Sequence, residues 1–413
     1  MIFAWSVKPN MTLRKTYSRK HLLFLLLIFP LLSLSFPLHV HADGGAPNLA
    51  YVSGTAHGIS VIDVAQQKVV RTISVAGDPH TILLSLDGGY LYVTQPTVGR
   101  FSVIAAQTGQ TICSASLPGQ PTLLASDPIT NSLYVAGNGA ARVSELDPTT
   151  CAVRRTFNTD SPVYGLAVAI LSDLPGGGSN QLWVAGTNAL TVFDDHTGHL
   201  LSTIPIEGDP QYVSIPPGDT VYVTTRQGSV DAVDIKTWQV HQLLTGGTFG
   251  TMDYDALTGE VYVPDEQHNI LDVLSPINAG TTTLPKEPNR VIRLDFPPQS
   301  VAITNDGLLG FVAERGGKVS MLDLLNRHII YTVDVGGTPH FVITGLYPPP
   351  VDTTPSRELS QQTSTQDNTR EIIGYALLVV SCIALLLLIF LFLRFRQVYG
   401  TEGRRRPPGT SLK

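Results

Sequence analysis

The chain has 413 residues, of which 43% are hydrophobic and three are cysteines, and its formal net charge is −6 at pH 7. This charge is unevenly spread, because residues 43–370 hold 31 of the 33 acidic groups but only 16 of the 27 basic groups, a formal charge of −15. A negative field of this size keeps a domain soluble and disfavours general binding to nucleic acid or anionic lipid.

Residues 1–42 are typical of a secretory signal peptide. Basic residues precede an apolar run over 22–38, and Ala42 supplies the small residue that a cleavage site needs. Pro30 and Pro37 interrupt the run, which favours a cleaved signal peptide. The alternative is an uncleaved N-terminal anchor.

Residues 43–346 repeat one pattern at intervals of 39 to 49 residues. Seven times an aromatic residue is followed by valine, at Tyr51-Val52, Tyr92-Val93, Tyr134-Val135, Trp183-Val184, Tyr222-Val223, Tyr262-Val263 and Phe311-Val312. Around each pair, apolar and polar residues alternate between Gly, Pro and Asp breaks, as half-buried antiparallel strands require. A period near 40 with this chemistry predicts an all-β, seven-bladed β-propeller.

Each unit divides into four short strands, which in the first unit are predicted over 49–53, 59–64, 68–74 and 80–86. A Gly-x-Pro turn introduces the fourth strand, at Gly77-Asp78-Pro79, Gly119-Gln120-Pro121, Gly208-Asp209-Pro210 and Gly337-Thr338-Pro339.

Three segments carry a family resemblance. Tyr92-Val93-Thr94 and Tyr222-Val223-Thr224 are close to the name motif of the YVTN propeller repeats, and Ser60-Val61-Ile62-Asp63 resembles their second strand. The resemblance covers about residues 48–345 and implies a fold similar to seven-bladed, lactonase-like propellers. WD-type repeats are disfavoured because no Trp-Asp dipeptide occurs.

The order of the motifs predicts how the ring closes. The strand after each Gly-x-Pro turn should be the innermost strand of a blade, and the last such strand, over 339–344, has no later strands to join. We predict a composite first blade in which 339–344 lies beside 49–74, which removes exposed edge strands. Disrupting this pairing should open the ring.

The C-terminal residues predict a stalk, a membrane span and a tail. Residues 347–371 are rich in Pro, Thr, Ser and Gln, as in an extended stalk. The segment from Ile372 to Leu393 is uncharged, and as a helix it would span about 33 Å, enough to cross a bilayer. The arginine-rich tail over 394–413 predicts a cytoplasmic C-terminus and an outside propeller; a buried core helix is the alternative.

The stalk also predicts an orientation. Because it follows the end of an innermost strand, the opposite face, which carries the Gly-x-Pro turns, should point away from the membrane. Two long loops, over 170–180 and 275–289, should lie on the membrane-proximal face. We interpret them as length variation, with a partner site as the alternative.

Cys113 and Cys151 lie in neighbouring units at non-equivalent places. Export permits a disulfide, but outer strands of adjacent blades diverge, which favours unbridged cysteines. Cys382 lies in the predicted span. Arg154 and Arg155 fall on an outer strand, where we expect solvated charges.

Catalytic motifs are absent from the sequence: it contains no Gly-x-Ser-x-Gly, Walker, His-Glu-x-x-His or Cys-x-x-Cys pattern. We therefore assign no catalytic residue, cofactor or metal site. Asp253 is a candidate general base, because small residues occupy the equivalent positions in other units. No partner acid or nucleophile accompanies it.

The best candidate site follows from the ring closure. His80 and His340 begin neighbouring innermost strands and should meet at the mouth of the central channel, with His57 in a loop nearby. Such imidazoles could bind a metal or respond to pH, or they could simply pack and hydrogen-bond at a strand start. Further ligand-binding candidates at the mouth are Gln211, Tyr212, Gln299 and Phe341.

The sequence thus predicts a membrane-anchored, extracytoplasmic propeller that serves as a binding or protein-interaction module, with a protein or small-molecule ligand at the face of the Gly-x-Pro turns. The alternatives are a lactonase-like or other hydrolase that uses the channel, and a purely structural surface protein, because propellers host all three.

Overall fold

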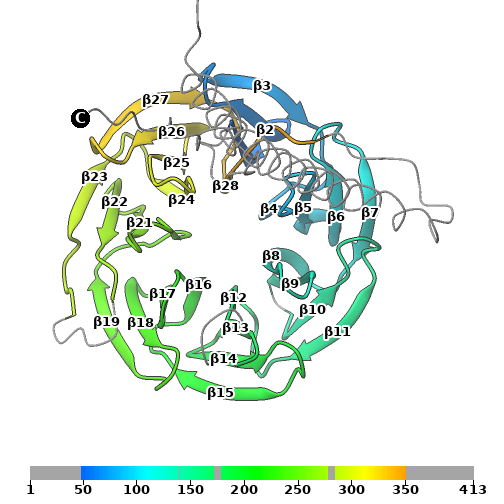
Figure 1. Ribbon diagram of the computed structural model, residues 1–413, viewed down its shortest axis with the longest axis vertical. Helices are drawn as coiled ribbons and strands as arrows, with labels where there is room; N and C mark the ends of the chain where they lie inside the picture. Colours follow the sequence, from blue (N-terminus) through cyan, green and yellow to red (C-terminus); the bar gives the residue numbers. More distant parts are fainter. Residues whose placement is uncertain (1–47, 139, 172–177, 278–283, 350–413) are drawn as a thin grey trace, which may run out of the picture. The chain divides into compact units, whose positions relative to one another are not determined.

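The computed structural model describes residues 48–138, 140–171, 178–277 and 284–349, in which 28 strands form seven four-stranded sheets. Figure 1 shows the sheets set radially around a central axis, with one strand of each near the axis and one on the periphery. The fold is therefore the predicted all-β, seven-bladed propeller.

Each blade contains four strands, which follow one another from the central axis outwards. Blade 1 comprises β28 (Phe341–Gly345), β1 (Leu49–Thr55), β2 (Gly58–Asp63) and β3 (Lys68–Ile73), and blade 2 comprises β4 (Ile82–Leu84), β5 (Tyr90–Gln95), β6 (Arg100–Ala105) and β7 (Thr111–Ser116). Blade 3 comprises β8 (Gln120–Asp127), β9 (Ser132–Asn138), β10 (Arg142–Leu146) and β11 (Val153–Asn158), and blade 4 comprises β12 (Gly165–Ala169), β13 (Gln181–Gly186), β14 (Ala189–Asp194) and β15 (Leu200–Pro205). Blade 5 comprises β16 (Pro210–Ser214), β17 (Thr220–Thr225), β18 (Ser229–Asp234) and β19 (Val240–Thr245). Blade 6 comprises β20 (Asp253–Tyr254), β21 (Val261–Asp265), β22 (Ile270–Leu274) and β23 (Arg290–Arg293), and blade 7 comprises β24 (Pro298–Ile303), β25 (Leu309–Glu314), β26 (Lys318–Asp323) and β27 (His328–Asp334). A short 3-10 helix, η1 (Pro96–Val98), joins β5 to β6.

The burial pattern explains the repeated aromatic–valine pair. The second strands β1 and β17 are buried at every position, whereas the outer strand β3 alternates between exposed and partly buried residues up to the buried Ile73. Each aromatic residue of the pair lies in a second strand and is at most 8% exposed. Neighbouring blades cover both faces of a second strand, so these aromatic side chains form the core between blades.

The first blade is composite, as predicted. β28 pairs antiparallel with β1 in a register that sets Tyr51 opposite Ile343, and Figure 1 shows the orange β28 beside the blue strands of the N-terminal part. At the far end of β28, the Tyr347 amide donates to the side chain of Asn48. The chain therefore enters and leaves the propeller on one face, which we call the bottom face; the Gly-x-Pro turns lie on the opposite top face.

Cys113 and Cys151 form a disulfide with their Cα atoms 5.7 Å apart, so the expectation of unbridged cysteines is wrong. Cys113 lies on the outer strand β7 of blade 2. Cys151 does not lie on an outer strand: it ends the β10–β11 turn of blade 3 in the left-handed region, with φ of 59°. This turn reaches over the preceding blade, so the two sulfur atoms meet although the outer strands diverge.

The same type of turn contacts the preceding blade elsewhere in the ring. Arg71 on β3 and Arg155 on β11 each donate to two backbone carbonyls in the corresponding turn of the next blade. In the strand register, Cys113 occupies the position that these two arginines occupy in blades 1 and 3. Arg155 also pairs with Glu145 of its own blade at 2.7 Å. Because it bonds the carbonyls of blade 4 as well, it joins two blades and is not the solvated charge that we expected.

Other predicted segments lie outside the described residues. These are the signal peptide, most of the stalk, the membrane span and the basic tail, together with 172–177 and 278–283 of the two long loops. Within the described part of the chain, no helix combines the length and the apolarity needed to cross a membrane.

Removing the disulfide should destabilise the propeller. A crosslink that closes a loop of 38 residues restricts the unfolded chain, and its loss should lower the free energy of unfolding by about 2–4 kcal/mol. We expect this decrease for Cys113→Ala/Cys151→Ala in urea unfolding followed by tryptophan fluorescence. Cys382→Ala is the control and should leave the midpoint unchanged; a double variant as stable as the parent would contradict the prediction.

Candidate functional site

The innermost strands of all seven blades, with the residues that lead into them, line one cavity of about 210 Å³ on the central axis. A second cavity of about 280 Å³ adjoins it at the top face and shares His80, Leu123 and Tyr212 with it. Together they form the channel mouth. It is lined by His80, Thr81, Thr122, Leu123, Leu124, Val163, Tyr164, Gly165, Leu166, Gln211, Tyr212, Val213, Arg226, Thr251, Met252, Gln299, His340 and Phe341.

The two histidines meet as predicted. The rings of His80 and His340 stack with centroids 4.9 Å apart and planes inclined by 20°. The meeting depends on ring closure, because His340 precedes β28 while His80 precedes β4. It also needs Gly54, which has φ of +74° and where a Cβ atom would lie 2.6 Å from Cδ2 of His340.

Burial, and then the neighbouring His340 ring, lower the pKa of His80 from its usual value to about 4. His80 is therefore neutral at physiological pH and offers one ring donor and one ring acceptor. Its backbone is fixed on both sides, since its amide donates to Thr94 and its carbonyl accepts from the Ser53 hydroxyl. Among the residues that the structure describes, no group of three or more His, Cys, Asp or Glu side chains is placed to hold a metal ion.

The other predicted ligand-binding residues differ in whether they line the channel mouth. Gln211, Tyr212, Gln299 and Phe341 all line the channel mouth. His57 lies in the exposed turn between β1 and β2 on the top face, and it lines neither cavity.

Arg226 is a member of the mouth that sequence reasoning missed. It lies in the top turn between β17 and β18, where its amide donates to the carbonyl of Asp209, and its guanidinium lies 5.0 Å from the centre of the Tyr164 ring. Within the described residues, no carboxylate lies at ion-pair distance from it. The available signal was an arginine directly after the Tyr-Val strand of blade 5.

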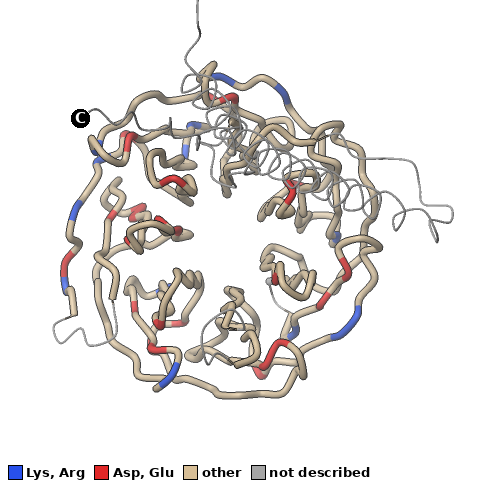
Figure 2. Tube along the Cα trace, in the orientation of Figure 1, with Lys and Arg blue, Asp and Glu red and all other residues tan. Residues whose placement is uncertain are grey.

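Charge sets the mouth apart from the rest of the propeller. Figure 2 shows that Lys and Arg lie mainly along the periphery of the ring. The mouth, however, contains Arg226 as its one basic side chain and no Asp or Glu among the described residues that line it. Burial raises the pKa of Tyr212, so its phenol remains a protonated donor. The mouth thus presents hydrogen-bond donors and the Arg226 guanidinium on walls that are partly polar and partly apolar.

Asp253 joins two blades and does not line the channel mouth. Its Oδ2 accepts a 2.7 Å hydrogen bond from the Ile303 amide, which belongs to the innermost strand of blade 7. Nearby, the Thr251 amide donates to the Gln299 carbonyl across the same boundary. Burial raises the pKa of Asp253 to about 6. These contacts give Asp253 a structural role between β20 and β24.

Comparisons with known proteins agree on the fold. No protein-family model and no curated relative matches this chain. Among solved structures, it is similar to a functionally unknown protein from Desulfotomaculum acetoxidans (14% identity, 72% of this chain and 99% of that one, TM-score 0.59). It is also similar to apo AztD from Citrobacter koseri (12% identity, 73% and 98%, TM-score 0.56) and to the dihydro-heme d1 dehydrogenase NirN (13% identity, 73% and 75%, TM-score 0.53). At these identities the likeness shows a propeller fold alone, and the YVTN resemblance stays a prediction.

Replacing Asp253 should change how stability depends on pH. The pKa of Asp253 is raised on folding, so between pH 4 and pH 6 the folded protein retains a proton that the unfolded chain loses. The contribution of Asp253 to the free energy of unfolding therefore falls as the pH rises through this window. Asp253→Asn can still accept from Ile303 but does not titrate. We expect the variant to gain about 1–2 kcal/mol relative to the parent between pH 4 and pH 7. Urea midpoints measured across this range test it, with Asp306→Asn as control, and a constant difference would contradict it.

Proposed function

We propose that this protein is a ligand-binding propeller whose site is the channel mouth on the top face, and that the ligand is a small organic anion. The observation that carries the proposal is Arg226, a cation without a carboxylate partner among the described residues, in a mouth lined by donors and no acid. A guanidinium binds a carboxylate through two parallel hydrogen bonds. Tyr164, Tyr212 and Phe341 provide apolar walls for the body of the ligand.

The hydrolase alternative has less support. An enzyme of that kind needs a general base or nucleophile at the channel, yet the described mouth contains no carboxylate, and His80 has a pKa of about 4, which makes it a weak base at neutral pH. Asp253 is engaged between two blades.

We further propose that the propeller lies outside the cell membrane and is anchored by 372–393. The support is the signal-like sequence over 1–42, the uncharged run followed by arginines, and the Cys113–Cys151 disulfide, which persists in oxidising compartments. Because the chain leaves the propeller on the bottom face, this anchoring turns the channel mouth away from the membrane.

The ligand proposal predicts a charge-dependent response of the full-length protein. Benzoate and phenylacetate should raise its melting temperature, whereas benzamide, which is similar in shape but neutral, should not. Arg226→Gln should weaken carboxylate binding about tenfold or more, because it removes a charge-assisted pair. Arg100→Gln, on an exposed position of β6, is the control. Equal shifts with benzamide, or a shift that survives in Arg226→Gln, would contradict the proposal.

The topology proposal predicts where the chain fractionates. Expressed in a bacterium, it should remain with membranes after alkaline carbonate washing, and deletion of 372–393 should release it. Alkylation of intact cells should leave Cys113 and Cys151 unmodified until a reductant is added. A soluble full-length chain, or cysteines that are alkylated without reduction, would contradict this topology.

A further inference from the structure

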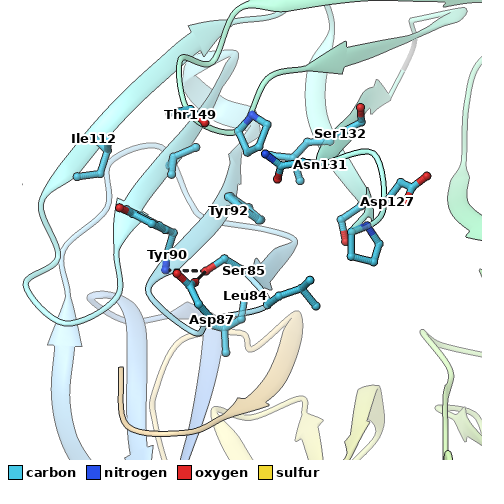
Figure 3. A pocket seen from close by; sticks show the side chains of 16 residues that line it. Leu84, Ser85, Asp87, Tyr90, Tyr92, Ile112, Asp127, Asn131, Ser132 and Thr149 are labelled. Carbon is cyan, nitrogen blue, oxygen red and sulfur yellow. Dashed lines mark hydrogen bonds between the residues drawn. The ribbon is translucent and has the colours of Figure 1, made fainter. Parts of the chain in front are cut away.

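A third cavity lies between blades 2 and 3 on the bottom face, away from the channel mouth. It measures about 440 Å³ and runs from the inner turns at Leu86 and Pro128 to the outer residues Ile112 and Thr149. Figure 3 shows Ser85, Asp87 and Tyr90 on one side of it and Asn131, Ser132 and Thr149 on the other. We call it the 2/3 groove.

At this boundary one outer-strand side chain differs from its equivalents at the two flanking boundaries. Between blades 1 and 2, and again between blades 3 and 4, an arginine of the outer strand donates to two carbonyls of the next blade's turn. Between blades 2 and 3 the same strand position holds Cys113, whose disulfide ties down only the outer end. Because this position holds a cysteine, no arginine side chain extends from it into the space between the disulfide and the central axis.

The core beside the groove shows the consequence. Tyr92, on β5 and facing blade 3, is 8% exposed, whereas the aromatic residues at the six equivalent positions are at most 2% exposed. Its hydroxyl makes no hydrogen bond to another described residue, which is also true of Tyr51 at the preceding boundary, whereas Tyr134 at the next boundary donates to Asp195. This boundary is therefore less completely filled than those beside it.

The residues that line the 2/3 groove offer acceptors for the guanidinium group that this boundary lacks. In the turn register, Pro148 and Thr149 correspond to Ala106 and Gln107, whose carbonyls accept from Arg71, and both border the groove. The described lining contains two carboxylates, Asp87 and Asp127, and no Lys or Arg. Asp87 is exposed, whereas Asp127 is 1% exposed and accepts both from the Ile129 amide of its own turn and from Asn180 of blade 4. A cation entering here would meet acceptors of the kind that bind arginine at the flanking boundaries.

The rim is apolar. Leu86 is 85% exposed, Ile129 is 52% exposed and Ile112 is 36% exposed. Exposed aliphatic side chains beside a concave pocket that carries Asp87 offer a polypeptide an apolar surface to pack against. The volume of the groove also exceeds what one arginine side chain fills, which leaves room for a neighbouring apolar residue.

The geometry points to the 2/3 groove as a docking site for a partner polypeptide that inserts an arginine side chain where Arg71 and Arg155 lie at the flanking boundaries, with an adjacent leucine or similar residue against Leu86 and Ile129. The negative charge of the domain assists the approach of such a partner. This site is independent of the ligand at the channel mouth.

The experiment uses the full-length protein in detergent and a fluorescein-labelled, capped peptide Gly-Leu-Arg-Leu-Gly. We expect saturable binding by fluorescence anisotropy, weakened about tenfold or more when citrulline replaces arginine, because citrulline keeps the shape but loses the charge. Equal binding of the citrulline peptide overturns the proposal. Binding of free N-acetylarginine amide as tight as that of the peptide overturns the assignment to a polypeptide.

Protein variants locate the binding. Cys113→Arg/Cys151→Gly recreates the arginine and glycine of blades 3 and 4 and should fill the groove, so binding should be lost while the melting curve stays cooperative. Asp87→Asn should weaken binding about fivefold or more. Asp306→Asn is the matched control, because Asp306 makes the same turn contact in blade 7 and lies outside the groove. Undiminished binding by Asp87→Asn and by a folded double variant overturns the proposal.

Discussion

The pairing of β28 with β1 is the constraint on which the rest of this propeller depends. Five residue pairs join the last strand of the ring to the first, and the cluster they cover includes Val52 and Val342 together with core residues of blade 7. A ring that did not close at this seam would expose two strand edges and the apolar faces behind them. The stacking of His80 on His340 is a direct product of this pairing, since the residues come from opposite ends of the repeat region.

Much of this architecture could be predicted from the sequence because its causes are local. Strand alternation, the aromatic–valine pair and the Gly-x-Pro turns each act over a few residues, and seven copies in register indicate the number of blades. The composite blade, and with it the histidine pair, followed from the order of these motifs. The exit of the chain beside Asn48 followed in the same way.

The remaining features depend on contacts between units, which no single repeat displays. The Cys113–Cys151 bridge required knowing that the β10–β11 turn reaches the preceding blade. A comparison of turns, in which Cys151 takes the left-handed position held by Gly109 and Gly198, would have indicated it. Asp253 stood out as an unusual residue, but its partner, the Ile303 amide, lies in another blade. Arg226 was not predicted as a site residue because the sequence of its turn resembles that of any turn whose side chains are exposed to solvent.

The direction of β28 has a mechanical consequence. The strand runs from the top face to the bottom face, and the chain continues from its lower end at Gly345, next to the start of β1. A pull through residue 347 that is directed along the strand axis loads all the β28–β1 hydrogen bonds together in shear, so they do not open one at a time. The seam that closes the ring thus also resists tension that is applied along β28.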